Sequence, residues 1–179
     1  MIFIEDDTSY VLHASPIDSG AILNEGLWLT LIGTNEIPPH IGLINERKYY
    51  SLSVHKVDCG SPSERLINML NRKNIPTLFA HIESRNNTGF FLEKFYKDLH
   101  LLGNNGNTCL SPIKQFFTQC YSADFYQINY VFELLALAEK KNLLKECKSL
   151  FCESTGRNNV TLPKYTMLAI NNKIRMLLS

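Results

Sequence analysis

Two residues of this chain have the type and the local setting of a thiol-hydrolase site. His40 lies at the start of a short apolar run (PPHIGLI, residues 38–44), and Cys109 lies in the segment NTCLSP. Cys109 precedes Pro112 by three residues, and proline is favoured in the first turn of a helix. A helix N-terminus stabilises a thiolate, and a nearby imidazole can take the thiol proton. The pattern therefore predicts Cys109 as a nucleophile, with His40 as base and then acid.

An imidazole base needs a third group that orients it. Residues 48–57 follow His40 and alternate between apolar and polar side chains, which is typical of a strand with one polar face. His55 and Ser51 both belong to that polar face. We therefore expect His55, or alternatively Ser51, to orient His40, and we expect backbone N–H groups at the start of the Cys109 helix to hold an oxyanion.

The first half of the chain is typical of β-structure around one helix. Strands are predicted at residues 26–34, 40–44, 48–57 and 75–82 in one antiparallel sheet, and residues 40–57 form a predicted hairpin. Between the third and fourth strands, the segment SPSE at residues 61–64 supplies a helix start, and apolar spacing predicts about three helical turns.

From about residue 89 onward the apolar spacing changes from two to about 3.6, which predicts helices. They are expected over 91–102, from Pro112, over 122–141 with continuation toward Phe151, and from Pro163 to Leu178. The sequence thus predicts an α+β domain. Residues 1–121 form the expected core, a small antiparallel sheet with packed helices, and residues 122–179 form a helical extension packed on the same domain.

The order of these features resembles the circularly permuted branch of the NlpC-type papain-like superfamily, which includes lecithin retinol acyltransferase-like proteins and bacterial hydrolases. In that branch a His-x-Gly-Ile-type strand comes first, a second strand carries the polar third residue, and the cysteine follows on a helix. The matching segments are residues 40–44, 48–55 and 107–117. The resemblance covers residues 26–118 and implies a permuted papain-like core.

The same resemblance implies a cysteine hydrolase or acyltransferase that acts on an amide, ester or thioester bond. Two positions depart from the family pattern. By hairpin length the third residue falls near Ser51, while His55 lies two pairs further on. Leu110 follows the cysteine, where a polar residue is often found. The expected partner is a small-molecule, peptide or lipid-like acyl substrate.

Composition and charge argue against several other classes of function. The chain has 179 residues with a formal charge of +1 and no long run of like charges, so nucleic acid is not an expected partner. No apolar run reaches the roughly 18 residues of a membrane span, and residues 1–7 lack the basic start of a secretory signal. Five cysteines without paired C-x-x-C spacing indicate free thiols, so we expect a cytoplasmic protein without a metal or other cofactor.

A second function from a different class is a catalytically inactive α+β module that binds another protein. Residues 122–179 exceed what a papain-like core requires, and amphipathic helices added to a domain commonly recruit a partner. The predicted helix over 122–141 is apolar around most of its girth, so it needs cover from several sides. That cover is expected from the sheet and from either the 163–178 helix or a second chain.

Overall fold

The computed structural model describes residues 9–17, 23–99, 108–153 and 158–178. Helices and strands occur in both halves of the chain, which confirms the predicted α+β class. In chain order the elements are β1 (Ser9–His13), β2 (Ser15–Pro16), β3 (Leu27–Ile32), β4 (His40–Asn45), β5 (Lys48–Leu52), β6 (Val57–Pro62), α1 (Ser63–Lys73), β7 (Thr77–Ile82), α2 (Thr88–Lys97), α3 (Leu110–Cys120), the 3-10 helix η3 (Ala123–Gln127), α4 (Val131–Lys140), β8 (Leu144–Leu150), β9 (Asn159–Pro163) and α5 (Met167–Leu178).

The main sheet has seven strands in the order β2-β8-β7-β3-β4-β5-β6. Its neighbours are antiparallel except for β2 and β8, which are parallel. The predicted hairpin is confirmed, because Gly42 pairs with Ser51 and Asn45 with Lys48. Strands β1 and β9 form a separate antiparallel pair. The sheet is therefore larger than the four-stranded antiparallel sheet that the sequence predicted.

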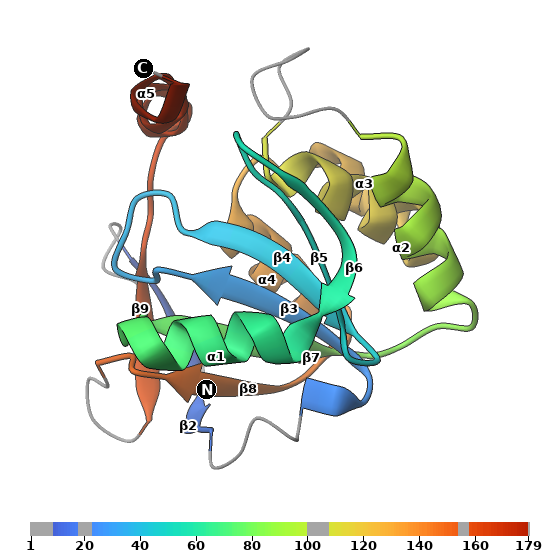
Figure 1. The fold of residues 1–179 in the computed structure, drawn as a ribbon, viewed down its shortest axis with the longest axis horizontal. Helices are drawn as coiled ribbons and strands as arrows, with labels where there is room; N and C mark the ends of the chain where they lie inside the picture. The colour runs from blue at the N-terminus through green and yellow to red at the C-terminus, as the bar shows by residue number, and fades with distance from the viewer. Residues whose placement is uncertain (1–8, 18–22, 100–107, 154–157, 179) are drawn as a thin grey trace.

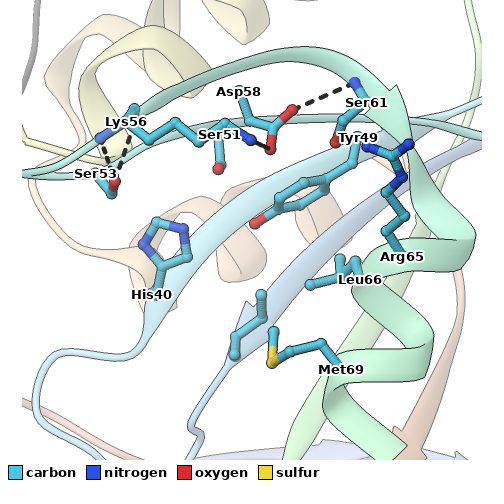
Figure 2. Close-up of a pocket in the computed structure, with 11 residues that line it drawn as sticks. His40, Tyr49, Ser51, Ser53, Lys56, Asp58, Ser61, Arg65, Leu66 and Met69 are labelled. Carbon is cyan, nitrogen blue, oxygen red and sulfur yellow. Dashed lines mark hydrogen bonds and ion pairs between the residues drawn. The ribbon is translucent and has the colours of Figure 1, made fainter.

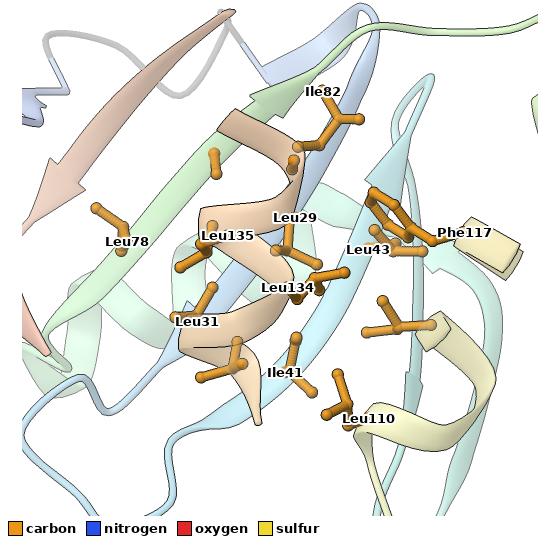
Figure 3. Packing of buried hydrophobic residues seen from close by; sticks show 14 of the residues in the cluster. Leu29, Leu31, Ile41, Leu43, Leu78, Ile82, Leu110, Phe117, Leu134 and Leu135 are labelled. Carbon is orange, nitrogen blue, oxygen red and sulfur yellow. The ribbon is translucent and has the colours of Figure 1, made fainter. Parts of the chain in front are cut away.

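Helices cover the sheet from both sides (Figure 1). Helix α1 crosses one face, and α3 and α4 lie against the other. Adjacent residues of a strand point to opposite faces, so β4 contributes to both layers. Ile41 and Leu43 belong to the core beneath α3 and α4, which Figure 3 shows packed with Leu134 and Phe117. Ile44 belongs instead to a second core beneath α1.

The long helix predicted over 122–141 is divided in the structure. Residues 123–127 form η3, and the chain is extended at Tyr130, where φ is −132° and ψ is 153°. The N–H of Tyr130 donates to Oε2 of Glu133 at 3.2 Å, which is the capping contact that starts α4. Apolar spacing continues across this break, so periodicity alone did not reveal it.

The predicted continuation of that helix toward Phe151 is wrong. Asn142 has a φ of +56° and follows the last turn of α4. Residues 144–150 then form β8, which lies inside the sheet between β2 and β7. Leu144, Cys147 and Leu150 are spaced by three residues, and this spacing imitates a helical stripe.

The C-terminal part is also less helical than predicted. Pro163 ends β9, and the final helix α5 begins only at Met167. Within α5, Ile170 is buried while most other side chains are exposed, and Lys173 pairs with Glu36 at 2.8 Å. Figure 1 shows α5 standing away from the main sheet, beyond β9. None of the helices in the described part of the chain is long and apolar enough to cross a membrane.

Candidate functional site

Cys109 lies at the N-cap position of α3, at the helix start that the sequence predicted. Two hydrogen bonds fix this turn. The N–H of Thr108 donates to Oγ of Ser111 at 2.9 Å, and the N–H of Ser111 donates to the carbonyl of Thr108 at 3.0 Å. Pro112 is buried in the first turn, where its missing N–H costs no helical bond. The local sequence thus holds the thiol at the positive end of α3.

The Cys109 thiol faces an apolar environment beside the β5–β6 hairpin. It packs against the buried pair Leu52 and Val54, as Val57 also does. Burial raises the pKa of the thiol, and backbone N–H groups of Ile41, Cys109 and Leu110 oppose part of that rise. The resting group is therefore a protonated thiol whose sulfur already lies close to backbone donors.

The contact with Ile41 places the thiol at the beginning of β4. Ile41 follows His40 in the chain, and the pairing of β4 with β5 begins one residue later, at Gly42. Cys109 therefore contacts β4 at the residue just before β4 begins to pair with β5. The backbone that carries His40 is directly adjacent.

His40 is the first residue of β4 and is partly buried. Burial lowers the pKa of its imidazole, and the carboxylate of Glu36 offsets part of this decrease. The imidazole is consequently neutral near pH 7 and can accept a proton. This charge state is the one that a general base requires.

The His40 side chain lines a cavity of about 380 Å³ on the α1 side of the sheet. Figure 2 shows His40 toward one end, Arg65 toward the other and the ring of Tyr49 between them. The full lining comprises Ile32, His40, Tyr49, Ser51, Ser53, Lys56, Asp58, Ser61, Arg65, Leu66 and Met69. The cavity thus combines an apolar floor with hydroxyl and charged groups.

The structure brings His40 and Ser51 into this cavity, but Cys109 is not part of its lining. His40 shares a strand face with Gly42, whereas Cys109 packs with the core that contains Ile41. The two side chains thus belong to opposite faces of β4. The Ile41 backbone, which bonds the Cys109 thiol and follows His40 in the chain, connects the two.

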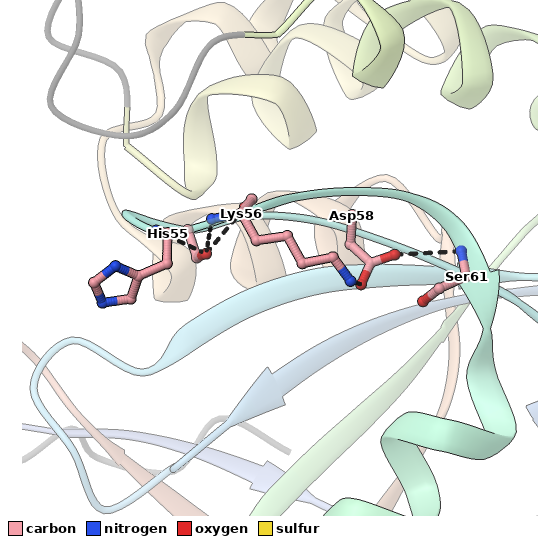
Figure 4. Close-up of polar contacts among 5 residues, drawn as sticks. His55, Lys56, Asp58 and Ser61 are labelled. Atoms are coloured by element: carbon pink, nitrogen blue, oxygen red, sulfur yellow. Dashed lines mark hydrogen bonds and ion pairs between the residues drawn. The ribbon is translucent and has the colours of Figure 1, made fainter.

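His55 lies outside the cavity lining, in the turn that follows β5. The strand predicted to run to residue 57 ends at Leu52. Ser53 closes the turn, because its N–H donates to the carbonyl of Lys56 at 2.9 Å. The imidazole of His55 is exposed at the end of the hairpin, as Figure 4 shows. Of the two orienting residues expected from the sequence, Ser51 is therefore the one that shares a cavity with His40.

Gly42 in the His-x-Gly motif has a steric role. A Cβ atom at this position would lie 2.6 Å from Cε2 and 2.7 Å from the hydroxyl of Tyr49. The ring of Tyr49 thus lies directly over the Gly42 backbone, and Tyr49 lines the same cavity as His40.

Three charged groups in or beside this cavity were not predicted from the sequence. Glu36 lies in the preceding loop, Arg65 in the first turn of α1, and Asp58 on β6. Glu36 is only four residues before His40, which is the one signal that the sequence offered. Arg65 comes from α1 and Asp58 from β6, which pack against β5 and against each other, and this packing cannot be inferred from spacing.

Comparisons with protein-family models, with curated proteins and with solved structures found no match to this chain. The resemblance to the permuted NlpC-type proteins therefore stays a prediction from the motif. In the described ranges no group of three or more His, Cys, Asp or Glu residues is arranged to hold a metal ion.

Proposed function

We propose that this protein is a cysteine hydrolase or acyltransferase in which Cys109 attacks the carbonyl of an amide, ester or thioester. The observation that carries the proposal is the position of the Cys109 thiol, at the start of α3 and against the N–H of Ile41. Ile41 is next to His40, which has the neutral imidazole that a base requires.

In this reaction the proton moves during the attack, because both groups are neutral at rest. The sulfur forms a bond to the carbonyl carbon while the thiol proton passes to the imidazole of His40. The carbonyl electron pair moves to oxygen, where backbone N–H groups at the start of α3 stabilise it. The bond to the leaving group then breaks, and His40 returns the proton to that group.

The product of this half-reaction is an acyl group on the Cys109 sulfur. Water releases it in a hydrolase, and a second nucleophile takes it in an acyltransferase, with His40 accepting the incoming proton in either case. The His40 side chain and the Cys109 thiol belong to opposite faces of β4, so rotation of the ring alone does not bring them together. The proposal requires the backbone at the start of β4 to move when substrate binds, so that the imidazole and the bound carbonyl meet the thiol. Ser51 is the candidate group that orients the ring.

The test is acylation by a simple activated ester. After incubation with p-nitrophenyl acetate, we expect peptide mapping by mass spectrometry to find one acetyl group on Cys109. Cys109→Ala removes this product, and His40→Gln slows its formation about 10²- to 10⁴-fold, the usual contribution of a general base.

Two matched controls are available. Cys59 is an exposed thiol and His81 is a second histidine whose pKa is lowered by burial, and neither lines the cavity. Cys59→Ala and His81→Gln should keep the acetylation rate of Cys109. Acetylation of Cys59 alone, or an unchanged rate in His40→Gln, contradicts the proposal.

A second candidate function, protein binding through the C-terminal helix, is favoured by one observation. Helix α5 exposes Leu168, Leu177 and Leu178, although it belongs to the folded chain. A photo-crosslinking residue at position 168 is expected to capture a protein in cells, whereas the same residue at Glu64 on α1 should not. Equal capture at both positions argues against this function.

A further inference from the structure

We propose that the cavity beside His40 selects acyl substrates that carry one carboxylate, and that Arg65 binds this carboxylate. The inference rests on the proposed function, and it narrows the expected substrate to a small carboxylated acyl compound. It is carried by the charges, the shape and the lining of the cavity (Figure 2).

The charges of the cavity leave one cation without a partner. Lys56 and Asp58 form an ion pair at 2.8 Å, and Asp58 also accepts a bond from the N–H of Ser61 at 3.3 Å. His40 is neutral near pH 7, for the reasons given above. Arg65 is an exposed residue of the lining, and within the described part of the chain it makes no ion pair. The lining therefore carries a net charge of +1, which one negative charge on a ligand would balance.

A carboxylate fits this arrangement better than a phosphate. The planar guanidinium of arginine binds either anion through two parallel hydrogen bonds, so the charge of the ligand has to decide between them. The side chain of Asp58 is only 14% exposed and lies in the same cavity, so a doubly charged phosphate would meet a second negative group. The electrostatics thus favour a single negative charge at Arg65.

The apolar lining determines what connects the carboxylate to the reacting carbonyl. Leu66 and Met69 of α1 form an apolar surface along the cavity between Arg65 and His40. Ile32 of β3 adds a third apolar side chain to the lining. A volume of about 380 Å³ is at the small end of ligand sites, so it suits a short hydrocarbon segment. The substrate class is consequently an ester, thioester or amide of a short dicarboxylic acid, with the scissile carbonyl at the His40 end.

The experiment compares two esters of equal length. One is the p-nitrophenyl monoester of glutaric acid, and the other is p-nitrophenyl valerate, which lacks the carboxylate. We expect Arg65→Gln to lower the ratio of kcat/KM for the glutarate ester to that for the valerate ester about 10- to 100-fold, mainly through KM. Arg65→Lys keeps the positive charge but not the two parallel hydrogen bonds of the guanidinium, so it should lower this ratio less.

The matched control is Arg72→Gln in the last turn of the same helix, outside the cavity, and it should keep the wild-type ratio. Circular dichroism verifies that each variant is folded. An unchanged ratio in both Arg65→Gln and Arg65→Lys overturns the inference while leaving the cysteine mechanism intact.

Binding without turnover separates the two proposals. We expect glutarate to bind to the Cys109→Ala protein in NMR titrations and Arg65→Gln to weaken this binding at least 10-fold. If glutarate binds in this way but no ester acylates Cys109 in the wild-type protein, the proposed function fails and the carboxylate site stands. Tighter binding of inorganic phosphate than of glutarate, or glutarate binding that is independent of Arg65, overturns the site.

Discussion

The two faces of the sheet at β4 differ in what they cover and in what they leave open. On one face, Ile41 and Leu43 are enclosed by α3 and α4 in a continuous apolar core. On the other, His40 borders a cavity with hydroxyl and charged groups, and Gly42 lies beneath the Tyr49 ring that lines this cavity. One strand therefore supplies the packing that holds the domain together and the polar groups that can act on a ligand.

The candidate catalytic groups are divided between these two faces. Cys109 approaches β4 from the apolar side, and His40 faces the polar side. Burial shifts both pKa values toward the uncharged forms, because it raises the pKa of a thiol and lowers that of an imidazole. A thiolate–imidazolium pair is thus disfavoured at rest, and any proton transfer between them must accompany substrate binding.

The largest effect is expected on the apolar face. Phe117 is completely buried, and its ring lies 5.1 Å from the rings of both Tyr121 and Phe125. Phe117→Ala removes these contacts and leaves a cavity, so the free energy of unfolding should fall by about 3–5 kcal/mol in urea denaturation. Phe90→Ala is the control, because Phe90 is 68% exposed and should change stability by less than about 0.5 kcal/mol. A similar loss of unfolding free energy in both variants would contradict the view that the apolar core around Phe117 holds the domain together.

The next effect lies on the polar face, where Gly42 meets Tyr49. The added methyl group of Gly42→Ala overlaps the Tyr49 ring, since a Cβ would lie 2.6 Å from it, and we expect a loss of about 1–3 kcal/mol in the free energy of unfolding. If this contact is the cause, the same substitution in a Tyr49→Ala background should cost less. Denaturation of the two single variants and the double variant measures this coupling. Additive losses would show that the ring does not set the requirement for glycine.

Local sequence patterns predicted the parts of the fold that depend on neighbouring residues. The hairpin over residues 40–57, the start of α1 and the position of Cys109 before α3 all follow from turn residues, prolines and alternation. Strand β8 was missed because its side chains have no clear alternation, and only its pairing with β7 and β2 shows it to be a strand.

The candidate site was predictable only in part, for a related reason. Spacing indicated that His40 and Cys109 lie at element starts, and both do. Which face of β4 each side chain meets depends on where α3 packs, and that is a long-range property. Arg65 and Asp58 share the cavity with His40 through tertiary packing alone, so no sequence motif predicted them.

The third effect is a dependence of stability on pH that arises on the polar face of the sheet, where His40 lies. Because burial lowers the pKa of His40, the unfolded chain binds a proton at a higher pH than the folded chain does. Stability should therefore fall as the pH drops from about 7 toward 5, by no more than about 1.4 kcal/mol per pH unit for this one group. His81 has a lowered pKa as well and contributes in the same direction.

We expect His40→Gln to make the dependence of the free energy of unfolding on pH shallower, and His40→Gln with His81→Gln to make it shallower still. Urea denaturation at several pH values above about 5 measures this, since the exposed carboxylates of Glu93 and Asp124 have lowered pKa values and respond at more acidic pH. A wild-type slope in the double variant would show that neither histidine is held neutral by burial.

The smallest effect is expected from the ion pair of Lys56 and Asp58 at the cavity rim. Lys56 is 66% exposed and Asp58 only 14%, so the lysine is hydrated while the carboxylate also accepts the N–H of Ser61. Lys56→Met should lower the free energy of unfolding by about 0.2–1 kcal/mol, and the difference should shrink in high salt. The same substitution removes the partner of Asp58, which leaves that carboxylate free to pair with Arg65 in the cavity. The free energy of glutarate binding should then fall by more than the free energy of unfolding does. Unchanged binding would mean that the Lys56–Asp58 pair and the Arg65 site are independent.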